Sequence, residues 1–304
     1  MDSIDAARAR YARMLAAQAG AADPRLERAF ATVPREQFLG RGSWLVEGPY
    51  GFIEVGTDNP TVLYRDVLVA LSPERGINNG QPSLHALSMA AMRIPLGGSV
   101  VHVGAGTGYY TAILAELVGP AGRVLAYEIE RDLADSAREN LAAWPTVEVR
   151  AASACDGPLP LADAVYVNAG ATHPLASWLD ALKPGGRLMF PLTSDHGVGG
   201  MLLVTRTGSR RDARDGRDGR DRADDADPRE DRVECFGARF TSSAAFIACR
   251  GARSEKHSQA VAAAFGRGTQ SAVNSLWRGA LPDDTAWCVG TGWWLSTGRC
   301  PPRA

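Results

Sequence analysis

The sequence predicts an α/β protein with a doubly wound, mostly parallel sheet and an antiparallel hairpin towards its C-terminal end. First, short apolar β-branched runs alternate with segments of helical periodicity, as in successive βαβ units. Second, the run VVHVGAGTGYY, Val100 to Tyr110, joins a buried strand to a helix through a glycine-rich turn. Third, Met201–Thr205 and Val233–Arg250 have the pattern of two further strands, expected to pair antiparallel across the segment that separates them. Together these observations place most of the chain in one large sheet.

The N-terminal part predicts helices over Ile4–Ala19 and Pro24–Thr32, the second of which is stopped by Pro34. Residues 42–69 are rich in glycine, proline and aromatic residues and predict irregular structure. Beyond them the expected helices are Ser83–Met92, Tyr110–Val118, Arg131–Ala143 and Pro174–Leu182. The expected strands are Val100–Val103, Arg123–Tyr127, Val147–Ala151, Ala164–Asn168 and the run LKPGGRLMFPL that ends at Leu192.

These elements divide the chain into five parts. Residues 1–80 form a helical and loop region on the substrate side, and residues 81–209 form the ligand-binding core. Residues 210–232 alternate arginine and aspartate without a large apolar residue, which predicts a disordered insertion. Residues 233–257 supply the last core strand. Residues 258–304 form an extension with a helical stretch and a tryptophan-rich end, expected as a strand or flap on the sheet or as a wall of the substrate pocket.

Composition excludes several classes of function. The 304 residues are 45% hydrophobic and 22% charged with a formal net charge of −1, so we expect neither nucleic acid nor an anionic membrane as partner. No apolar run approaches the roughly 20 residues that cross a bilayer, and the N-terminus lacks the pattern of a secretory signal. The five cysteines form no C-x-x-C pair, which predicts free thiols in a reducing cytoplasm and no metal site.

The glycine turn predicts a nucleoside site. Gly104, Gly106 and Gly108 let the backbone turn tightly and a ligand approach it closely. Glu128 ends the next strand, where open α/β sheets bind ligands, and its carboxylate can accept both hydroxyls of a ribose. A dinucleotide fingerprint has its third glycine one position later. Tyr109 occupies that position here, which disfavours an NAD-dependent oxidoreductase.

This spacing instead resembles the class I S-adenosylmethionine-dependent methyltransferases. Further blocks are similar to protein-L-isoaspartate (D-aspartate) O-methyltransferases: DPRLERAFATVPREQFL, GINNGQPSLHA, VVHVGAGTGYYTAILA, VLAYE, ADAVYVNAGA and LKPGGRLMFPL, in that order. The resemblance covers roughly residues 23–205 and implies a Rossmann-like class I methyltransferase fold with S-adenosylmethionine as cofactor. It also implies that His85 lies near the cofactor, with the three glycines and Glu128.

Three positions depart from the family pattern. Gly80 stands where the family has a serine thought to assist at the reacting centre. His102 replaces an acid two residues before the first motif glycine, and Ser153 replaces the acid that faces the adenine amino group. The resemblance therefore implies weaker side-chain contacts to the cofactor at His102 and Ser153, while the glycine turn and Glu128 stay in place.

The predicted activity is S-adenosylmethionine-dependent carboxyl O-methylation. A carboxylate is already ionised near pH 7, so catalysis rests on positioning. We expect Asn79, Gly80 and Gln81 to orient the acceptor and Asn168 to reach the methyl donor. Plain turn chemistry is the competing explanation for the asparagines.

Three readings of the acceptor and role stay open at this stage. One is a specialised relative that methylates a peptide or small-molecule carboxylate, and another is isoaspartyl protein repair. The third is a non-catalytic module that binds S-adenosylmethionine. The sequence does not decide the oligomeric state.

Overall fold

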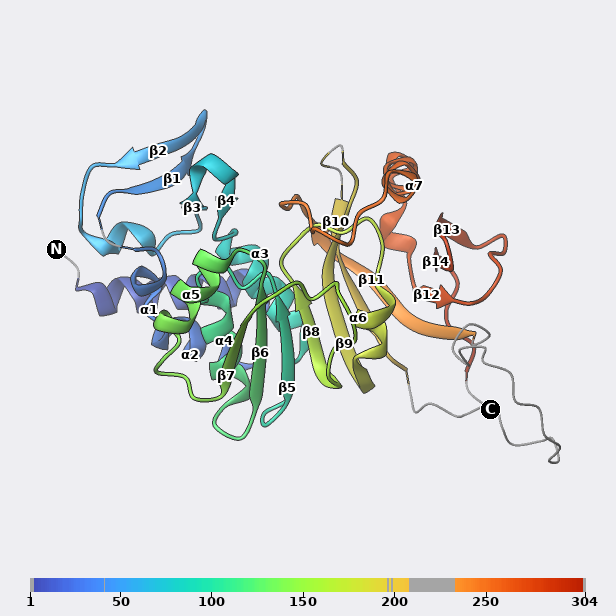
Figure 1. The fold of residues 1–304 in the computed structure, drawn as a ribbon, viewed down its shortest axis with the longest axis horizontal. Helices are drawn as coiled ribbons and strands as arrows, with labels where there is room; N and C mark the ends of the chain where they lie inside the picture. The colour runs from blue at the N-terminus through green and yellow to red at the C-terminus, as the bar shows by residue number, and fades with distance from the viewer. Residues whose placement is uncertain (1–2, 41, 196, 198, 208–232, 303–304) are drawn as a thin grey trace.

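The computed structural model describes residues 3–40, 42–195, 197, 199–207 and 233–302. Its centre is a ten-stranded sheet in the order β13-β14-β12-β11-β10-β9-β8-β5-β6-β7 (Figure 1). One half of this sheet is parallel. It consists of β7 (Val147–Ala151), β6 (Arg123–Glu128), β5 (Ser99–Val103), β8 (Ala162–Val167) and β9 (Leu182–Thr193).

The other half of the sheet is antiparallel. It continues from β9 through β10 (Gly199–Thr205), β11 (Glu234–Ser243), β12 (Ser275–Arg278), β14 (Trp293–Ser296) and β13 (Ala286–Val289). The α/β fold and the β10–β11 hairpin are confirmed. The antiparallel part is larger than a hairpin, because three strands from the C-terminal region join the same sheet.

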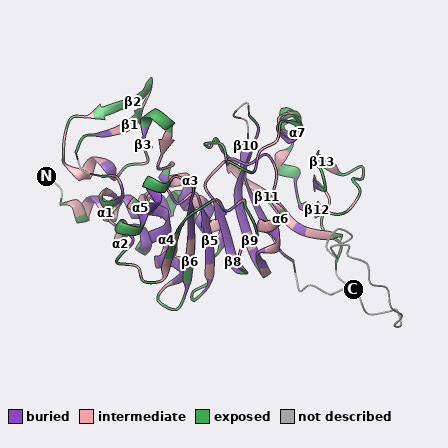
Figure 2. Ribbon diagram, viewed as in Figure 1, coloured by how far each residue is buried: buried purple, intermediate pink, exposed green. Residues whose placement is uncertain are grey.

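Helices cover both faces of the sheet, which separates two hydrophobic clusters. Val100 faces a cluster that includes α1 (Ile4–Gln18), α2 (Pro24–Thr32), α3 (Pro82–Met92) and α4 (Tyr109–Val118). Val101 faces the other cluster, with α6 (Ala176–Asp180) and α7 (Glu255–Gly266). Successive residues of β5 thus point to opposite faces, as the strand period requires. Figure 2 shows the central strands as largely buried.

The N-terminal region contains more regular structure than the sequence predicted. Within residues 42–69, β1 (Trp44–Gly48) and β2 (Gly51–Val55) form an antiparallel hairpin, so the expectation of irregular structure there is wrong. Its strand β2 is mostly exposed (Figure 2), and β1 lies beside the short pair β3 (Ala70–Ser72) and β4 (Ile77–Asn78). Because few of its side chains are buried, β2 lacks the alternation of apolar and polar residues that marks a half-buried strand.

A buried arginine fixes the loop that follows this hairpin. Arg35 lies in the short 3₁₀ helix η1 (Arg35–Phe38) and is fully buried. Its guanidinium donates to the carbonyls of Arg65, at 2.9 Å, and Val67, at 2.7 Å, and also to that of Leu63. Since a charged group must be hydrogen-bonded to be buried at tolerable cost, these contacts hold residues 63–67 against the helices.

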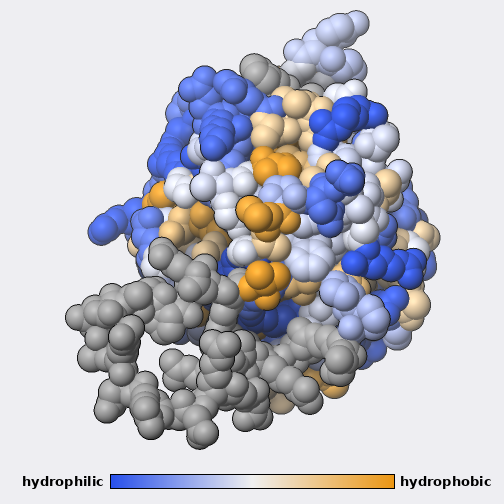
Figure 3. Space-filling view, turned by 90° about the vertical axis from the view of Figure 1, so that its right-hand side faces the viewer, coloured by the Kyte–Doolittle hydropathy of each residue, from blue (hydrophilic) through white to orange (hydrophobic). Residues whose placement is uncertain are grey.

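The C-terminal strands are tied back to the core by a covalent bond. Cys235 in β11 and Cys300 after β14 form a disulfide across 65 residues. The prediction of free thiols is therefore wrong for these two cysteines and holds for Cys155, Cys249 and Cys288. Figure 3 looks at this end of the molecule and shows apolar residues gathered in the middle of a mostly hydrophilic face.

Three further expectations concern the disordered insertion, membrane-spanning helices and metal sites. The predicted disordered insertion at 210–232 lies outside the described residues. No helix within the described part of the chain is long and apolar enough to span a bilayer. Those same residues contain no cluster of three or more histidine, cysteine or acidic side chains placed to hold a metal ion.

Candidate functional site

A cavity of about 1160 Å³ lies where β5 and β8 end. The segment from Gly104 to Thr107 forms one part of its wall, and the segment from Asn78 to His85 forms another. Asn168 and the end of β11 also line the cavity. Ligand cavities of single small molecules are usually about 300–1,000 Å³, so this one has room for a cofactor and an acceptor together.

The glycine turn has the geometry of a ligand cradle. Gly104 has a φ of +78°, and a Cβ there would lie 3.4 Å from the carbonyl oxygen of Asn168. The N–H groups of Gly104 and Ala105 donate to the Tyr127 carbonyl at 2.9 and 3.1 Å, which pins the turn to the neighbouring strand. An adenosyl group fits a wall of this kind, because bare backbone admits the closest approach.

Glu128 is fixed against this turn. One carboxylate oxygen accepts the N–H of Gly106 at 2.7 Å and the other accepts that of Glu130 at 3.0 Å. The side chain is buried, and burial raises the pKa of Glu128 against the lowering effect of these two bonds. Each oxygen keeps a second lone pair, so the carboxylate has the capacity to accept ribose hydroxyls.

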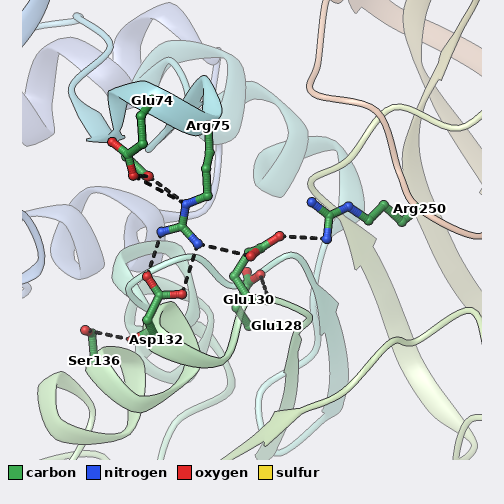
Figure 4. A network of polar contacts seen from close by, with 8 residues as sticks. Glu74, Arg75, Glu128, Glu130, Asp132, Ser136 and Arg250 are labelled. Carbon is green, nitrogen blue, oxygen red and sulfur yellow. Dashed lines mark hydrogen bonds and ion pairs between the residues drawn. The ribbon is translucent and has the colours of Figure 1, made fainter.

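Ion pairs surround the segment that carries Glu128 (Figure 4). Arg75, in the 3₁₀ helix η3 (Pro73–Arg75), contacts Glu130 at 3.0 Å and Asp132 at 2.6 Å. Arg250 reaches Glu130 from the other side at 2.9 Å. Three segments that are distant in sequence thus meet beside the predicted ribose site.

His102 supports the site from behind and does not line it. It is fully buried, and its Nε2 lies 2.7 Å from Nδ2 of Asn168. Burial lowers the pKa of His102 to about 3, so the ring is neutral, Nε2 accepts and Nδ1 donates to Thr111 at 2.8 Å. The predicted direct contact of His102 with the cofactor is replaced by a positioning role: it turns Asn168 so that Oδ1, which has no partner, is free.

His85 fills the space beside Gly80. Its ring stacks on Tyr110 at 3.6 Å, and its Nδ1 lies 2.7 Å from the Tyr166 hydroxyl. A Cβ at Gly80, where φ is +74°, would lie 2.2 Å from Nε2 of His85. Nε2 is buried and has no partner. The imidazole therefore occupies the volume that any side chain at position 80 would need.

Asn79 and Gln81 are held by different contacts. Oδ1 of Asn79 accepts the N–H of Val69 at 2.8 Å, which leaves its buried Nδ2 without a partner. Nε2 of Gln81 donates to Asp66 at 3.0 Å. The other oxygen of Asp66 accepts the N–H of Ser83 at 2.7 Å, at the start of α3. Turn chemistry accounts for part of these contacts, but not for the unpartnered amide of Asn79.

The structure brings most of the predicted site residues to one cavity. Its lining includes the four predicted catalytic residues and three of the predicted cofactor residues: Asn79, Gly80, Gln81, Asn168, His85, Gly104 and Gly106. Glu128 contacts the turn from outside this lining.

Gly108 and Ser153 have other contacts. At Gly108 a Cβ would lie 2.7 Å from Leu141, so this glycine permits helix packing. Ser153 accepts the N–H of Cys155 at 3.1 Å and does not line the cavity. A direct role of either residue in cofactor binding stays a prediction.

The C-terminal half builds a further wall of the same cavity, from Phe240 and Ser242 in β11 and from Phe265 and Gln270 beyond it. The sequence offered a pocket wall as one alternative for residues 258–304, which include Phe265 and Gln270, but it gave no signal for Phe240 and Ser242. Nothing local indicates which aromatic residues approach the glycine turn.

Residues 13–211 match the family model described as protein-L-isoaspartate (D-aspartate) O-methyltransferase. This chain belongs to that family. It is 32% identical over 197 residues to a protein-L-isoaspartate O-methyltransferase of Bradyrhizobium, a match that covers 64% of this chain and 82% of the relative. A relative from Methanopyrus kandleri is 38% identical over 127 residues, but only 56% of its length is covered.

Solved structures agree in fold. A protein-L-isoaspartate O-methyltransferase superposes with a TM-score of 0.59 at 22% identity, covering 79% of this chain and 65% of that one. A putative protein-L-isoaspartate O-methyltransferase from Plasmodium falciparum, in complex with S-adenosyl-L-homocysteine, gives a TM-score of 0.57 at 17% identity and covers 80% of this chain and 98% of that one. These likenesses confirm the Rossmann-like methyltransferase fold.

Membership also confirms the enzyme class and cofactor expected from the sequence, namely an O-methyltransferase family whose methyl donor is S-adenosylmethionine. The family match ends at residue 211. It therefore includes the glycine turn and Glu128 but excludes β11, α7 and the three C-terminal strands.

Proposed function

We propose that this protein transfers the methyl group of S-adenosylmethionine to a carboxylate of a peptide or small molecule. The observation that carries the proposal is a set of three buried polar atoms without partners around one cavity. They are Nδ2 of Asn79, Nε2 of His85 and Oδ1 of Asn168. Leaving a buried polar group unpaired costs about 1–3 kcal/mol. Such a cost is expected where a ligand supplies the missing partner.

The cofactor side fits the adenosyl group. When bound, S-adenosylmethionine supplies an electrophilic methyl group. The backbone from Gly104 to Gly106 would hold its nucleoside, and Glu128 would accept the ribose hydroxyls. Arg75 and Arg250 keep the segment around Glu128 in place through Glu130.

The acceptor side needs donors and no base. A carboxylate is ionised at neutral pH, and the amide of Asn79 offers two N–H groups. Burial keeps the pKa of His85 well below its usual value, so its ring is neutral. With the Tyr166 hydroxyl donating to Nδ1, the proton of the ring lies on Nε2. Both donors would then hold one carboxylate oxygen and leave the other free to accept the methyl group that the bound cofactor supplies.

Two sets of observations bear on the identity of the acceptor, and they favour different candidates. The family match supports isoaspartyl peptides, as in the relatives named protein-L-isoaspartate O-methyltransferase. His85 filling the space at Gly80 and the added strands support a specialised acceptor. We favour the specialised acceptor, with isoaspartyl repair as the second candidate and a non-catalytic binding module as the third.

The test is methyl transfer from labelled S-adenosylmethionine to peptides, followed by release of methanol in base. The probes are one peptide with an isoaspartyl, an aspartyl or a glutamyl residue at the same position. We expect base-labile label in at least one of them. Label confined to the isoaspartyl peptide would move the assignment to repair. If the protein binds S-adenosylmethionine but labels neither the peptides nor small carboxylic acids, the assignment would move to the non-catalytic binding module.

The cellular compartment of the protein is a further part of this proposal. The composition favours the cytoplasm, whereas a disulfide such as Cys235–Cys300 is more typical of oxidising compartments. We propose the cytoplasm with the disulfide as an added brace of the C-terminal strands.

A further inference from the structure

One wall of the cavity is built by residues outside the family match. Phe240 and Ser242 lie in β11, Phe265 lies in α7, and Gln270 begins the 3₁₀ helix η4 (Gln270–Ala272). All four line the cavity that also contains the glycine turn. This wall is therefore the part of the site in which this chain goes beyond the matched region that ends at residue 211.

Two polar atoms in this wall are buried and have no partner within the described residues. They are Oγ of Ser242 and Oε1 of Gln270. A side-chain amide oxygen accepts a hydrogen bond, and a hydroxyl can both donate and accept. Together they match the N–H and C=O of a peptide group.

The same wall also presents an apolar surface to the cavity. The rings of Phe240 and Phe265 lie 5.2 Å apart, and Trp287 from β13 packs edge-on against both, at 5.4 and 5.3 Å. Phe240 and Phe265 reach the cavity, whereas Trp287 lies behind them. Aromatic rings in such a position offer a large apolar contact area.

Trp287 also fixes the segment that carries Gln270. Its indole N–H donates to the Thr269 hydroxyl at 3.1 Å, and its carbonyl accepts from Arg267. The residue before Gln270 is thus held by the sheet. Because its neighbour is fixed, the Gln270 side chain is positioned before a ligand binds, which lowers the entropic cost of binding.

We propose that this wall is an acceptor subsite that binds a peptide through one main-chain amide and one apolar side chain next to the methylated residue. The proposal rests on the proposed function and narrows its acceptor class from any carboxylate to a peptide. Gln270 and Ser242 bind the amide, and Phe240 with Phe265 receives the apolar side chain. These residues determine specificity and take no part in the methyl-transfer step.

Peptide binding to the protein loaded with S-adenosylhomocysteine tests this subsite without turnover. The probes are alanine-based hexapeptides with one isoaspartyl residue and a single phenylalanine at each other position in turn, with the all-alanine peptide as reference. We expect one phenylalanine position to bind about tenfold tighter than the reference. Gln270→Leu should weaken that peptide about tenfold, because the amide N–H loses its acceptor.

The control is Gln259→Leu, the same change at an exposed position of α7, where the glutamine donates a hydrogen bond to Glu255 on the same helix. It should leave peptide binding unchanged, and both variants should bind S-adenosylhomocysteine as the parent does. Equal binding of all peptides, or a parent-like Gln270→Leu, would overturn the subsite. A third outcome separates the two proposals. If the parent chain binds one peptide selectively, Gln270→Leu loses that selectivity and no peptide is methylated, the subsite stands and only the proposed function is refuted.

Discussion

The two halves of the cavity wall are built by different means. The cofactor half comes from β5, β6 and β8, which pair in parallel, and from one continuous run of sequence between Ser99 and Glu128. The acceptor half comes from β11, α7 and η4, which the antiparallel sheet and the aromatic cluster around Trp287 bring together. A local motif thus holds the nucleoside, whereas long-range packing shapes the space for the acceptor.

Trp287→Ala is expected to have the largest effect on the acceptor half while leaving the cofactor half intact. Removing a buried tryptophan typically costs about 3–5 kcal/mol of unfolding free energy, and here it also releases Thr269 and Phe265. We expect a clear fall in the melting temperature and loss of peptide selectivity, with unchanged affinity for S-adenosylmethionine.

Trp277→Ala is the matched control for that change. Trp277 stacks on Trp294 at 5.6 Å and does not line the cavity. It should lower stability less and leave peptide binding intact. If Trp287→Ala weakened cofactor and peptide equally, the two halves would not be separable.

A smaller effect is expected where the two halves meet, at Gly80. Gly80→Ser places a Cβ at a φ of +74° and 2.2 Å from His85, so strain and overpacking should cost about 2–4 kcal/mol. Restoring the family's serine is therefore expected to lower stability without a gain in isoaspartyl methylation. Denaturant unfolding and the methanol assay measure the two effects.

The double variant Gly80→Ser with His85→Ala tests the reason for that loss. Removing the imidazole makes room for the serine, so part of the lost stability should return. A stable, more active Gly80→Ser single variant would show that His85 moves aside freely and that the space beside Gly80 is not fixed.

The smallest effect concerns two buried histidines, His102 behind Asn168 and His85 beside Gly80. Burial lowers the pKa of His102 to about 3 and that of His85 well below its usual value, so both are neutral in the folded chain. Below pH 6.5 the unfolded chain binds these protons first. His102 should thus lower the unfolding free energy by about 1.4 kcal/mol per pH unit as the pH drops from 6.5 towards 3, and His85 should add a decline in the same direction.

His102→Gln isolates one of these two contributions. Melting curves between pH 7.5 and 5 should show a shallower decline for the variant than for the parent chain. An identical slope in the two proteins would mean that His102 is protonated in the folded state, which would reverse the hydrogen-bond roles assigned to His102 and Asn168.

The cofactor half was largely predictable from sequence because its elements follow one another and its turn chemistry is local. Gly104, Gly106 and Asn168 line the cavity as expected. His102 was misplaced because a strand residue's facing depends on which neighbours cover it, here Thr111 and Asn168.

The acceptor half could not be predicted in the same way. Gln270 lies more than 160 residues beyond Gly104, and no periodic pattern links the two. The Cys235–Cys300 bond depends on the path of β12–β14, which returns the chain so that Cys300 lies beside Cys235. The hairpin β1–β2 was missed because its exposed side chains lack the alternation that burial would impose.

Calorimetric titration of S-adenosylmethionine into three proteins tests the central claim most directly: the parent chain, Glu128→Ala and Gln270→Leu. Losing an ionised acceptor of two hydroxyls should weaken binding about 100-fold in Glu128→Ala, and Gln270→Leu should bind as the parent does. Parent-like binding by Glu128→Ala, or an equal loss in Gln270→Leu, would contradict the division of this cavity into a cofactor half and an acceptor half.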